Sequence, residues 1–272
     1  MKDRKKSKRK FKLGLTAIVI LVTLAIAILA YLFIFGDPSN FQGNSRDNLP
    51  LPNNYFGIIY KGGIIVPLLM CVMLVMLTFS VERFIAIRKA EGFDPVIDFV
   101  KEIQDKVAHG RIDEALEDCD EQKGSVANVL SSVLKKYKEV EYEDMEKDQK
   151  LTAIQKEIEE ATALELPGLE QNLVILSTIT SVATMLGLLG TVLGMIRAFS
   201  ALANAGAPDS VQLASGISEA LVNTALGIGT AILATVAYNY FSTRIDKLLF
   251  CIDEAGFSIV QTYAAKHKMK NN

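Results

Sequence analysis

Four long apolar segments constrain this chain more than any other feature of its sequence. They cover residues 13–35, 64–81, 173–196 and 211–241. A helix needs about 20 apolar residues to cross a bilayer, and each segment is close to or above that length. Half of the 272 residues are hydrophobic and 22% are charged, which fits apolar spans alternating with charged segments. We therefore predict an all-α integral membrane protein with four transmembrane helices.

The first apolar segment admits two interpretations. Its basic start suits a signal peptide, but its apolar run is longer than the roughly 7–15 residues of a signal sequence. No clear cleavage site of small residues follows Phe35. We therefore expect a retained membrane anchor.

The distribution of Lys and Arg predicts the orientation, because basic loops stay in the cytoplasm. Residues 1–12 are rich in Lys and Arg, residues 36–60 contain only Arg46, and residues 201–210 contain none. Basic residues return after the second and fourth segments. Both chain ends are therefore expected inside. Arg197, near the outer end of the third segment, is the one exception.

The charged segment between the second and third spans has a helical pattern. Asp94-Pro95 predicts a cap followed by Pro at the first helical position, and His109-Gly110 predicts the end of that helix. Shorter helices are predicted from Ile112 and over residues 125–137. Residues 139–150 read as a loop or a solvated helix start.

From Leu151 the apolar pattern continues toward the third span. We expect one helix running from the cytoplasm into the membrane, with an adjustment at Pro167-Gly168. A catalytic domain is one interpretation of this acidic region, in which Asp118, Asp120 and Glu121 cluster. A helical bundle with solvated charged faces explains the same pattern, and is the one we expect.

Glu219 is the only charged residue in the fourth apolar segment, and Asn223 follows it one helical turn later. A carboxylate at membrane depth costs about 2.5 kcal/mol or more, so it usually faces protein or water rather than lipid. An ion pathway is the first hypothesis for such a residue.

Small and hydroxyl-bearing residues recur at helical spacing on one face of each of the last two segments. They are Ser177, Thr180, Thr184, Gly187, Thr191, Gly194 and Ala198 in the third, and Gly216, Ala220, Asn223, Gly227, Thr230 and Ala234 in the fourth. Such residues let membrane helices pack closely, which is one explanation. In a ring of several copies, the same stripes would line a pore or a slot for a partner helix.

Other site chemistries have little support. The three cysteines lie far apart, the two histidines lack ligand spacing, and no nucleotide-binding or acyl-transfer motif is present. We expect no metal, no cofactor, no enzymatic activity and no nucleic-acid partner.

Two long motifs carry a family resemblance. Residues 187–199, GLLGTVLGMIRAF, and residues 216–227, GISEALVNTALG, resemble the ExbB/TolQ branch of the MotA/TolQ/ExbB proton-channel family. The lead-in at residues 164–170, LELPGLE, and the helix end at residues 81–84, VERF, resemble the same branch. The resemblance is strong over residues 151–241, weaker over residues 64–134 and absent over the first 60.

The resemblance implies a pore-forming pentamer in the bacterial inner membrane. The ring would surround the single helices of an ExbD- or TolR-like partner, whose Asp carries the proton, and would drive a TonB- or TolA-like protein. Thr191, Glu219 and Thr224 fall on the family's pore positions. Asn223 stands where the family has Ala, and Thr184 stands where many relatives have Pro. The first span is an addition, since ExbB members usually have three.

The expected organisation combines the spans with this resemblance. It runs from a basic cytoplasmic N-terminus (1–12) through an anchor (13–35), a periplasmic loop (36–60) and a second span (61–87). A cytoplasmic helical region (88–168) precedes a pore helix (169–200), a periplasmic loop (201–210), a second pore helix (211–243) and a cytoplasmic C-terminal helix (244–272). Two of the long membrane helices are expected to extend into the cytoplasmic bundle.

The resulting functional hypothesis is a motor subunit that uses the proton motive force to energise TonB-dependent outer-membrane transport. Glu219 would either carry the proton or set the field and water content of the path, and the second role is favoured because the family places its carrier on the partner. A TolQ-like envelope motor, a flagellar or gliding stator, a secondary transporter and a non-conducting scaffold are the alternatives. The sequence leaves the choice between H⁺ and Na⁺ open.

Overall fold

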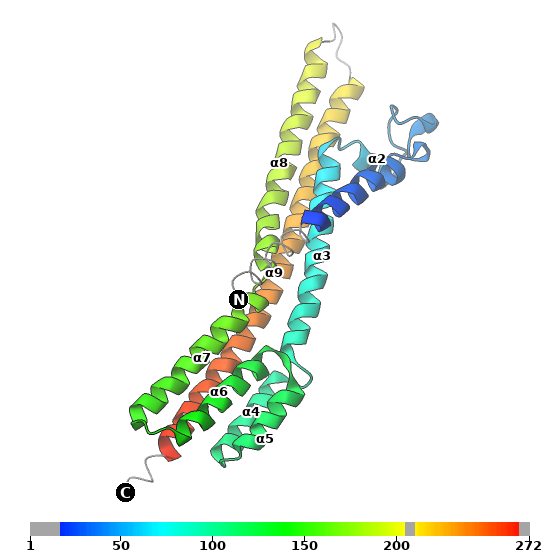
Figure 1. Cartoon of the computed structure of the whole chain (residues 1–272). Helices are drawn as coiled ribbons and strands as arrows, with labels where there is room; N and C mark the ends of the chain where they lie inside the picture. Colours follow the sequence, from blue (N-terminus) through cyan, green and yellow to red (C-terminus); the bar gives the residue numbers. More distant parts are fainter. Residues whose placement is uncertain (1–16, 205–209, 267–272) are drawn as a thin grey trace. The chain divides into compact units, whose positions relative to one another are not determined.

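The computed structural model describes residues 17–204 and 210–266 (Figure 1). In these residues the fold is helical, and the only β interaction is an isolated bridge between Phe41 and Pro50. The chain divides into two compact units. The first comprises Met1–Ser80 and Ile175–Tyr238, and the second comprises Val81–Val174 and Asn239–Asn272.

Four helices of the described residues are long and apolar enough to cross a membrane. One is Ala17–Phe35, and the other spans lie in α3 (Ile65–Glu91), α8 (Leu173–Asn204) and α9 (Ser210–Lys266). The prediction of an all-helical protein with four candidate spans is confirmed. Residues 1–16, 205–209 and 267–272, which include the predicted basic N-terminus and half of the 201–210 loop, lie outside the described residues.

In the first unit, a short folded segment links the first helix to α3. It contains 3-10 turns at Pro38–Asn40 (η2) and Gln42–Asn44 (η3) and the short helix α2 (Tyr55–Tyr60), after a π-helical turn at Tyr31–Phe35 (η1). The rings of Tyr31 and Tyr60 stack at 4.7 Å, and the Tyr31 hydroxyl donates to the Tyr60 carbonyl at 2.9 Å. These contacts fasten the end of the first helix to the end of α2, shortly before α3 begins.

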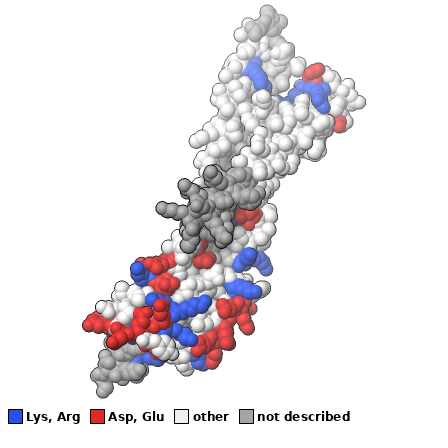
Figure 2. Space-filling model, viewed as in Figure 1, with Lys and Arg blue, Asp and Glu red and all other residues white. Residues whose placement is uncertain are grey.

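The second unit is a helical bundle. Its helices are α4 (Val96–Ala108), α5 (Ile112–Gln122), α6 (Gly124–Tyr142), α7 (Lys147–Leu169) and the adjoining parts of α3 and α9. Fully buried apolar side chains from five of these helices form the core: Ile103, Ala115, Leu130, Leu134, Ile154, Ile252 and Ile259. On the face shown in Figure 2, charged side chains crowd this unit, whereas the described part of the first unit carries few.

The predicted start of α4 is wrong in detail. Pro95 occupies the N-cap position rather than the first helical position, and no side chain caps α4. Gln122 holds Asp94 instead: its amide donates to the Asp94 carbonyl at 2.8 Å and accepts from the Asp94 N–H at 2.9 Å. This bridge fastens the start of α4 to the end of α5.

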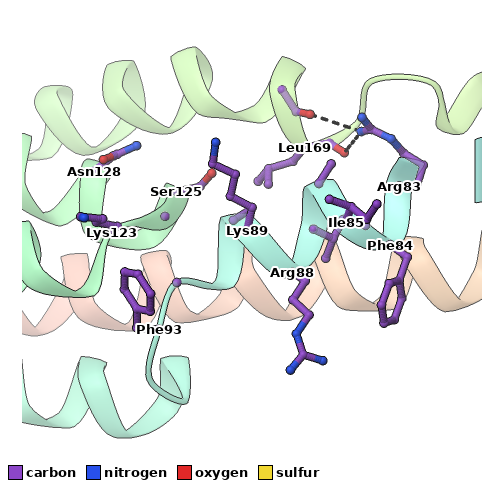
Figure 3. Close-up of a pocket in the computed structure, with 16 residues that line it drawn as sticks. Arg83, Phe84, Ile85, Arg88, Lys89, Phe93, Lys123, Ser125, Asn128 and Leu169 are labelled. Atoms are coloured by element: carbon purple, nitrogen blue, oxygen red, sulfur yellow. Dashed lines mark hydrogen bonds between the residues drawn. The ribbon is translucent and has the colours of Figure 1, made fainter. Parts of the chain in front are cut away.

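The predicted continuous helix into the third span is also wrong. α7 ends at Leu169, α8 begins at Leu173, and Asn172 between them has a positive φ of 64°. Arg83 donates to the carbonyls of Gly168 at 3.4 Å and Leu169 at 3.2 Å (Figure 3). Carbonyls at a helix end lack intrahelical partners, so this buried guanidinium replaces the amides of a next turn. The helices that do continue between the units are α3 and α9.

Candidate functional site

Two threonines predicted to line a path face each other across the first unit. The hydroxyls of Thr191 on α8 and Thr224 on α9 are in hydrogen-bond contact. One hydroxyl must donate to the other, and each also lies within hydrogen-bond distance of a carbonyl of its own helix, Thr191 of Gly187 at 3.2 Å and Thr224 of Ala220 at 3.1 Å. Both side chains are half-buried. The structure therefore brings together two polar groups that the sequence places on separate spans.

Glycines on α8 and α9 allow this contact, because they let the two backbones approach closely. A Cβ at Gly194 would lie 2.7 Å from the Ala220 nitrogen, and a Cβ at Gly227 would lie 2.6 Å from the Ala183 carbonyl oxygen. Gly187 faces Gly227 in the same seam. These three glycines thus pack helix against helix within one chain, and their expected lining of a pore stays a prediction.

Glu219 makes an ion pair that its sequence pattern does not indicate. Nη1 of Arg197 on α8 donates to both carboxylate oxygens of Glu219, at 2.6 and 2.7 Å. The Glu219 side chain is 7% exposed, whereas that of Arg197 is 55% exposed. The buried carboxylate is therefore paired with a counter-charge that is itself half-exposed, and a buried charge needs such a partner. The signal for Arg197 was its position as a lone basic residue at the expected outer end of a span.

The turn before α3 completes the surroundings of Glu219. A Cβ at Gly63 would lie 2.3 Å from Glu219 Oε1, and Gly63 has a φ of +76°, so both space and backbone favour glycine there. The neighbouring carbonyl of Gly62 accepts from the Asn223 side-chain amide at 2.8 Å. The sequence did not identify Gly62 and Gly63 as part of the site, because no local pattern indicates contacts with Asn223 and Glu219, more than 150 residues later.

Asn223 is fully buried, and its amide oxygen has no hydrogen-bond partner among the described residues. A buried acceptor of this kind is usually satisfied by water or a ligand. The remaining predicted residues, Thr180 and Thr184, bond carbonyls one turn earlier on α8, at 3.4 and 3.0 Å. Their hydroxyls are half-buried and lie on the same helix as Thr191.

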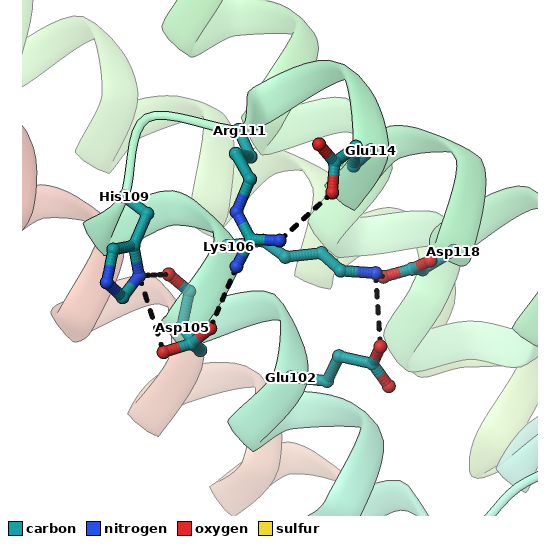
Figure 4. Close-up of polar contacts among 7 residues, drawn as sticks. All are labelled: Glu102, Asp105, Lys106, His109, Arg111, Glu114 and Asp118. Carbon is teal, nitrogen blue, oxygen red and sulfur yellow. Dashed lines mark hydrogen bonds and ion pairs between the residues drawn. The ribbon is translucent and has the colours of Figure 1, made fainter.

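Asp118, one of the three residues of the acidic cluster considered as a catalytic alternative, takes part in a set of salt bridges between α4 and α5 (Figure 4). Lys106 of α4 contacts Asp118 of α5 and pairs with Glu102 at 3.0 Å. The Asp118 hydrogen bond is the main cause that raises the Lys106 pKa above its usual value. Arg111 bridges Asp105 at 3.0 Å and Glu114 at 3.1 Å. Within the described ranges no three His, Cys, Asp or Glu side chains form a group that could hold a metal ion.

Comparisons with known protein sequences point to one family. A sequence model of the MotA/TolQ/ExbB proton channel family matches residues 121–254, about half of the chain. The Tol-Pal system protein TolQ of Haemophilus influenzae is 42% identical over 84 residues, which are 31% of this chain and 37% of that protein. A biopolymer transport protein ExbB homologue of Methanothermobacter thermautotrophicus is 30% identical over 200 residues, covering 71% of this chain and 66% of the relative.

An ExbB-like biopolymer transport protein of Synechocystis is 37% identical over 112 residues, covering 40% of this chain and 53% of the relative. In each case the match spans less than two thirds of the relative's length. The family match includes Glu219, Thr191 and Thr224. The chain belongs to the MotA/TolQ/ExbB proton channel family, and its four apolar helices make it a multi-pass membrane protein.

Proposed function

We propose that this chain is the proton-channel subunit of an ExbB–ExbD-type motor in the bacterial inner membrane, with both chain ends in the cytoplasm. The motor would use the proton motive force to energise a TonB-like protein for transport across the outer membrane. The main observation behind this proposal is the polar contact between Thr191 and Thr224. It lies one to two turns from Glu219, inside helices that are long enough to span a bilayer. Family membership and relatives named as biopolymer transport proteins support the assignment.

In this proposal the path forms between several copies rather than inside one. Along α8 runs an open groove of about 610 Å³ whose lining begins at Thr191 and continues over Met195, Phe199 and Ala203. A ring of five chains would turn such surfaces toward the helices of an ExbD-like partner. The partner's Asp would take up the proton on one side and release it on the other.

The Arg197–Glu219 pair favours a field-setting role for Glu219 over a carrying role. If Glu219 took up a proton, the guanidinium charge of Arg197 would lose its counter-ion, 2.6 Å away. Moving one charge through the membrane field releases about 2.3 kcal/mol per 100 mV, so one or two protons supply a motor step of a few kcal/mol. Glu219 would then shape the potential and hold water beside Asn223, whose amide oxygen is available as an acceptor.

A TolQ-like envelope motor is the second candidate, because the Haemophilus relative that carries that name is 42% identical over 84 residues. The chemistry of the path would be the same, and the difference lies in the protein that is driven. Copurification separates the two: an ExbD- and TonB-like pair supports the first assignment, and a TolR- and TolA-like pair supports the second.

Proton flux tests the proposal. The complex with its single-span partner is reconstituted into vesicles that enclose a pH-sensitive dye, and a K⁺ gradient with valinomycin sets the membrane potential. Flux should exceed that of protein-free vesicles and should fall in Thr191→Val. Thr243→Val is the matched control, because this exposed hydroxyl only bonds its own helix, at Asn239. A complex that passes neither H⁺ nor Na⁺ would leave only the scaffold interpretation.

Two further variants assign the role of Glu219. Glu219→Gln should reduce flux, because the Arg197 charge loses its partner and repels cations. The double variant Arg197→Gln/Glu219→Gln should recover part of the flux, since neither charge is left alone. A double variant as inactive as Glu219→Gln would instead make Glu219 an obligatory carrier.

A further inference from the structure

The second unit contains a cavity of about 690 Å³ that the proposed ion path does not use. Its walls come from the last turns of α3, the turn at Gly92 and Phe93, the start of α6 and the end of α7 (Figure 3). Its volume is within the usual range of ligand sites, about 300–1,000 Å³. The cavity begins directly after the apolar part of α3, where a membrane helix would leave the hydrocarbon.

The charges that line the cavity have one sign. Arg83, Arg88, Lys89 and Lys123 contribute to the lining, and no Asp or Glu does. Arg83 is already bound by Glu82 and the end of α7. Lys89 and Lys123 are exposed and have no ion pair within residues 17–204 and 210–266. Figure 3 shows both lysines on the α6 side of the cavity, while Arg88 points away from it. The Lys123 ammonium lies over the Phe93 ring, 5.5 Å from its centroid, and neither lysine has a carboxylate partner among the described residues.

The start of α6 adds further groups that suit an anion. Ser125 lines the cavity beside Lys123, and no side chain caps the helix N-terminus, while the Asn128 amide donates to Glu165 at 3.2 Å. Free amides at the start of a 19-residue helix favour negative charge. The position is held tightly, since a Cβ at Gly124 would lie 2.5 Å from the Ala90 carbonyl oxygen of α3. The amides and the two lysines thus lie at the same end of the cavity.

The remaining wall is apolar and exposed. Ile85 is 62% exposed and Phe93 76%, and Leu169 completes the lining, whereas the Phe84 ring lies on the same side of α3 as Arg88 (Figure 3). Ile85 belongs to the part of α3 that follows the apolar stretch most closely, whereas Lys89 lies one turn further along. A ligand that satisfies both ends is an amphiphile with an anionic head and a hydrocarbon chain.

We propose that this cavity binds one anionic phospholipid of the bilayer leaflet that the end of α3 faces. The phosphate lies against Lys89, Lys123 and the N-terminus of α6, and an acyl chain lies against Ile85 and Leu169. Basic pockets beside membrane helices select anionic headgroups in this way. The proposal rests on the membrane-spanning character of α3 and does not depend on ion conduction.

Lipid titration of the purified full-length protein in a neutral detergent tests this site. Phosphatidylglycerol and phosphatidylcholine are added separately, and native mass spectrometry counts the lipids bound per chain. One phosphatidylglycerol should bind per chain, and Lys89→Gln/Lys123→Gln should weaken it about tenfold or more. The matched control is Lys101→Gln/Lys135→Gln, which removes the same charge from exposed lysines outside the cavity. Equal losses in both double variants would reduce the effect to general surface charge and overturn the proposal.

Two further arms identify the source of the phosphate and guard against misfolding. Glycerol 3-phosphate should not displace the lipid, and Ile85→Ala should weaken phosphatidylglycerol binding; displacement by the soluble phosphate would mean that the ligand is not a lipid. In the unsubstituted protein, phosphatidylglycerol should protect Lys89 and Lys123 from amine acylation but leave Lys101 reactive. Unchanged acylation of all three lysines would contradict the assignment without any variant.

Discussion

The close approach of α8 and α9 predicts opposite outcomes for two glycines that lie two residues apart on α9. A Cβ at Gly227 would lie 2.6 Å from the Ala183 carbonyl oxygen and 2.8 Å from the Gly187 Cα, both backbone atoms that cannot rotate away. A Cβ at Gly229 would meet no atom within 4 Å. Gly227→Ala should therefore force the helices apart, whereas Gly229→Ala should be accommodated.

The magnitude follows from two terms. Alanine gains about 0.8–1.0 kcal/mol over glycine in a helix interior, and this gain is common to both positions. Overpacking costs about 1–3 kcal/mol and applies only to Gly227. Gly227→Ala should thus be less stable than Gly229→Ala by about 1–3 kcal/mol, and Gly229→Ala should be no less stable than the parent.

A thiol probe measures this difference, because the chain contains no Trp and its three cysteines are all buried. With Cys119 and Cys251 replaced by Ala, only Cys71 of the first unit remains to react with a maleimide dye. The protein is unfolded by increasing the SDS fraction in maltoside micelles. If the two glycine variants unfold at the same SDS fraction, the backbones do not approach as closely as described.

Two further predictions concern buried polar groups. Removing either partner of the Arg197–Glu219 pair should destabilise the first unit by about 1–3 kcal/mol, and the double replacement by Gln should cost less than the sum; additive losses in this cycle would mean that the pair contributes nothing. In the second unit, Tyr137→Phe should leave stability unchanged or raise it at pH 7, because the buried Tyr137 hydroxyl has no hydrogen-bond partner among the described residues. Burial raises the pKa of both Tyr137 and Tyr263 to about 12, so folding opposes their ionisation and stability should fall as pH rises from about 10 to 12. Alkaline titration followed by circular dichroism should show a shallower fall in Tyr137→Phe than in the parent, and identical curves would contradict the burial of that hydroxyl.

The spans could be predicted from sequence because bilayer thickness fixes the length of an apolar helix. The ends of these helices could not be predicted in the same way. The apolar composition ends where a helix leaves the hydrocarbon of the bilayer, even if the helix itself continues. α3 continues to Glu91 and α9 comprises 57 residues, well beyond their apolar parts. The break between α7 and α8 could not be predicted either, because it depends on a contact between distant residues. Pro167 is accommodated inside α7, and the helix ends where Arg83 binds its last carbonyls.

The candidate site divides in the same way. Glu219, Asn223 and the threonines stand out because polar residues are rare in apolar segments. Arg197 pairs with Glu219 across two helices, which depends on the register of α8 against α9 rather than on any local pattern. The glycine stripe was recognised, but sequence alone does not distinguish a face that packs from a face that lines a pore. The structure shows that Gly187, Gly194 and Gly227 lie where the backbones of α8 and α9 approach each other, so in one chain these glycines belong to a packing face.

The most direct test of a wet path through the membrane is the reactivity of a thiol placed on it. In a complex whose native cysteines are replaced by Ala, Thr224→Cys and Leu29→Cys are exposed to a small, water-soluble cationic methanethiosulfonate. Leu29 serves as the lipid-facing comparison, since it lies in the first apolar helix and is 55% exposed. Rapid modification at Thr224→Cys with little at Leu29→Cys is the result expected here. An unreactive thiol at position 224, in a complex that still assembles with its partner, would contradict a hydrated route past Thr191 and Glu219.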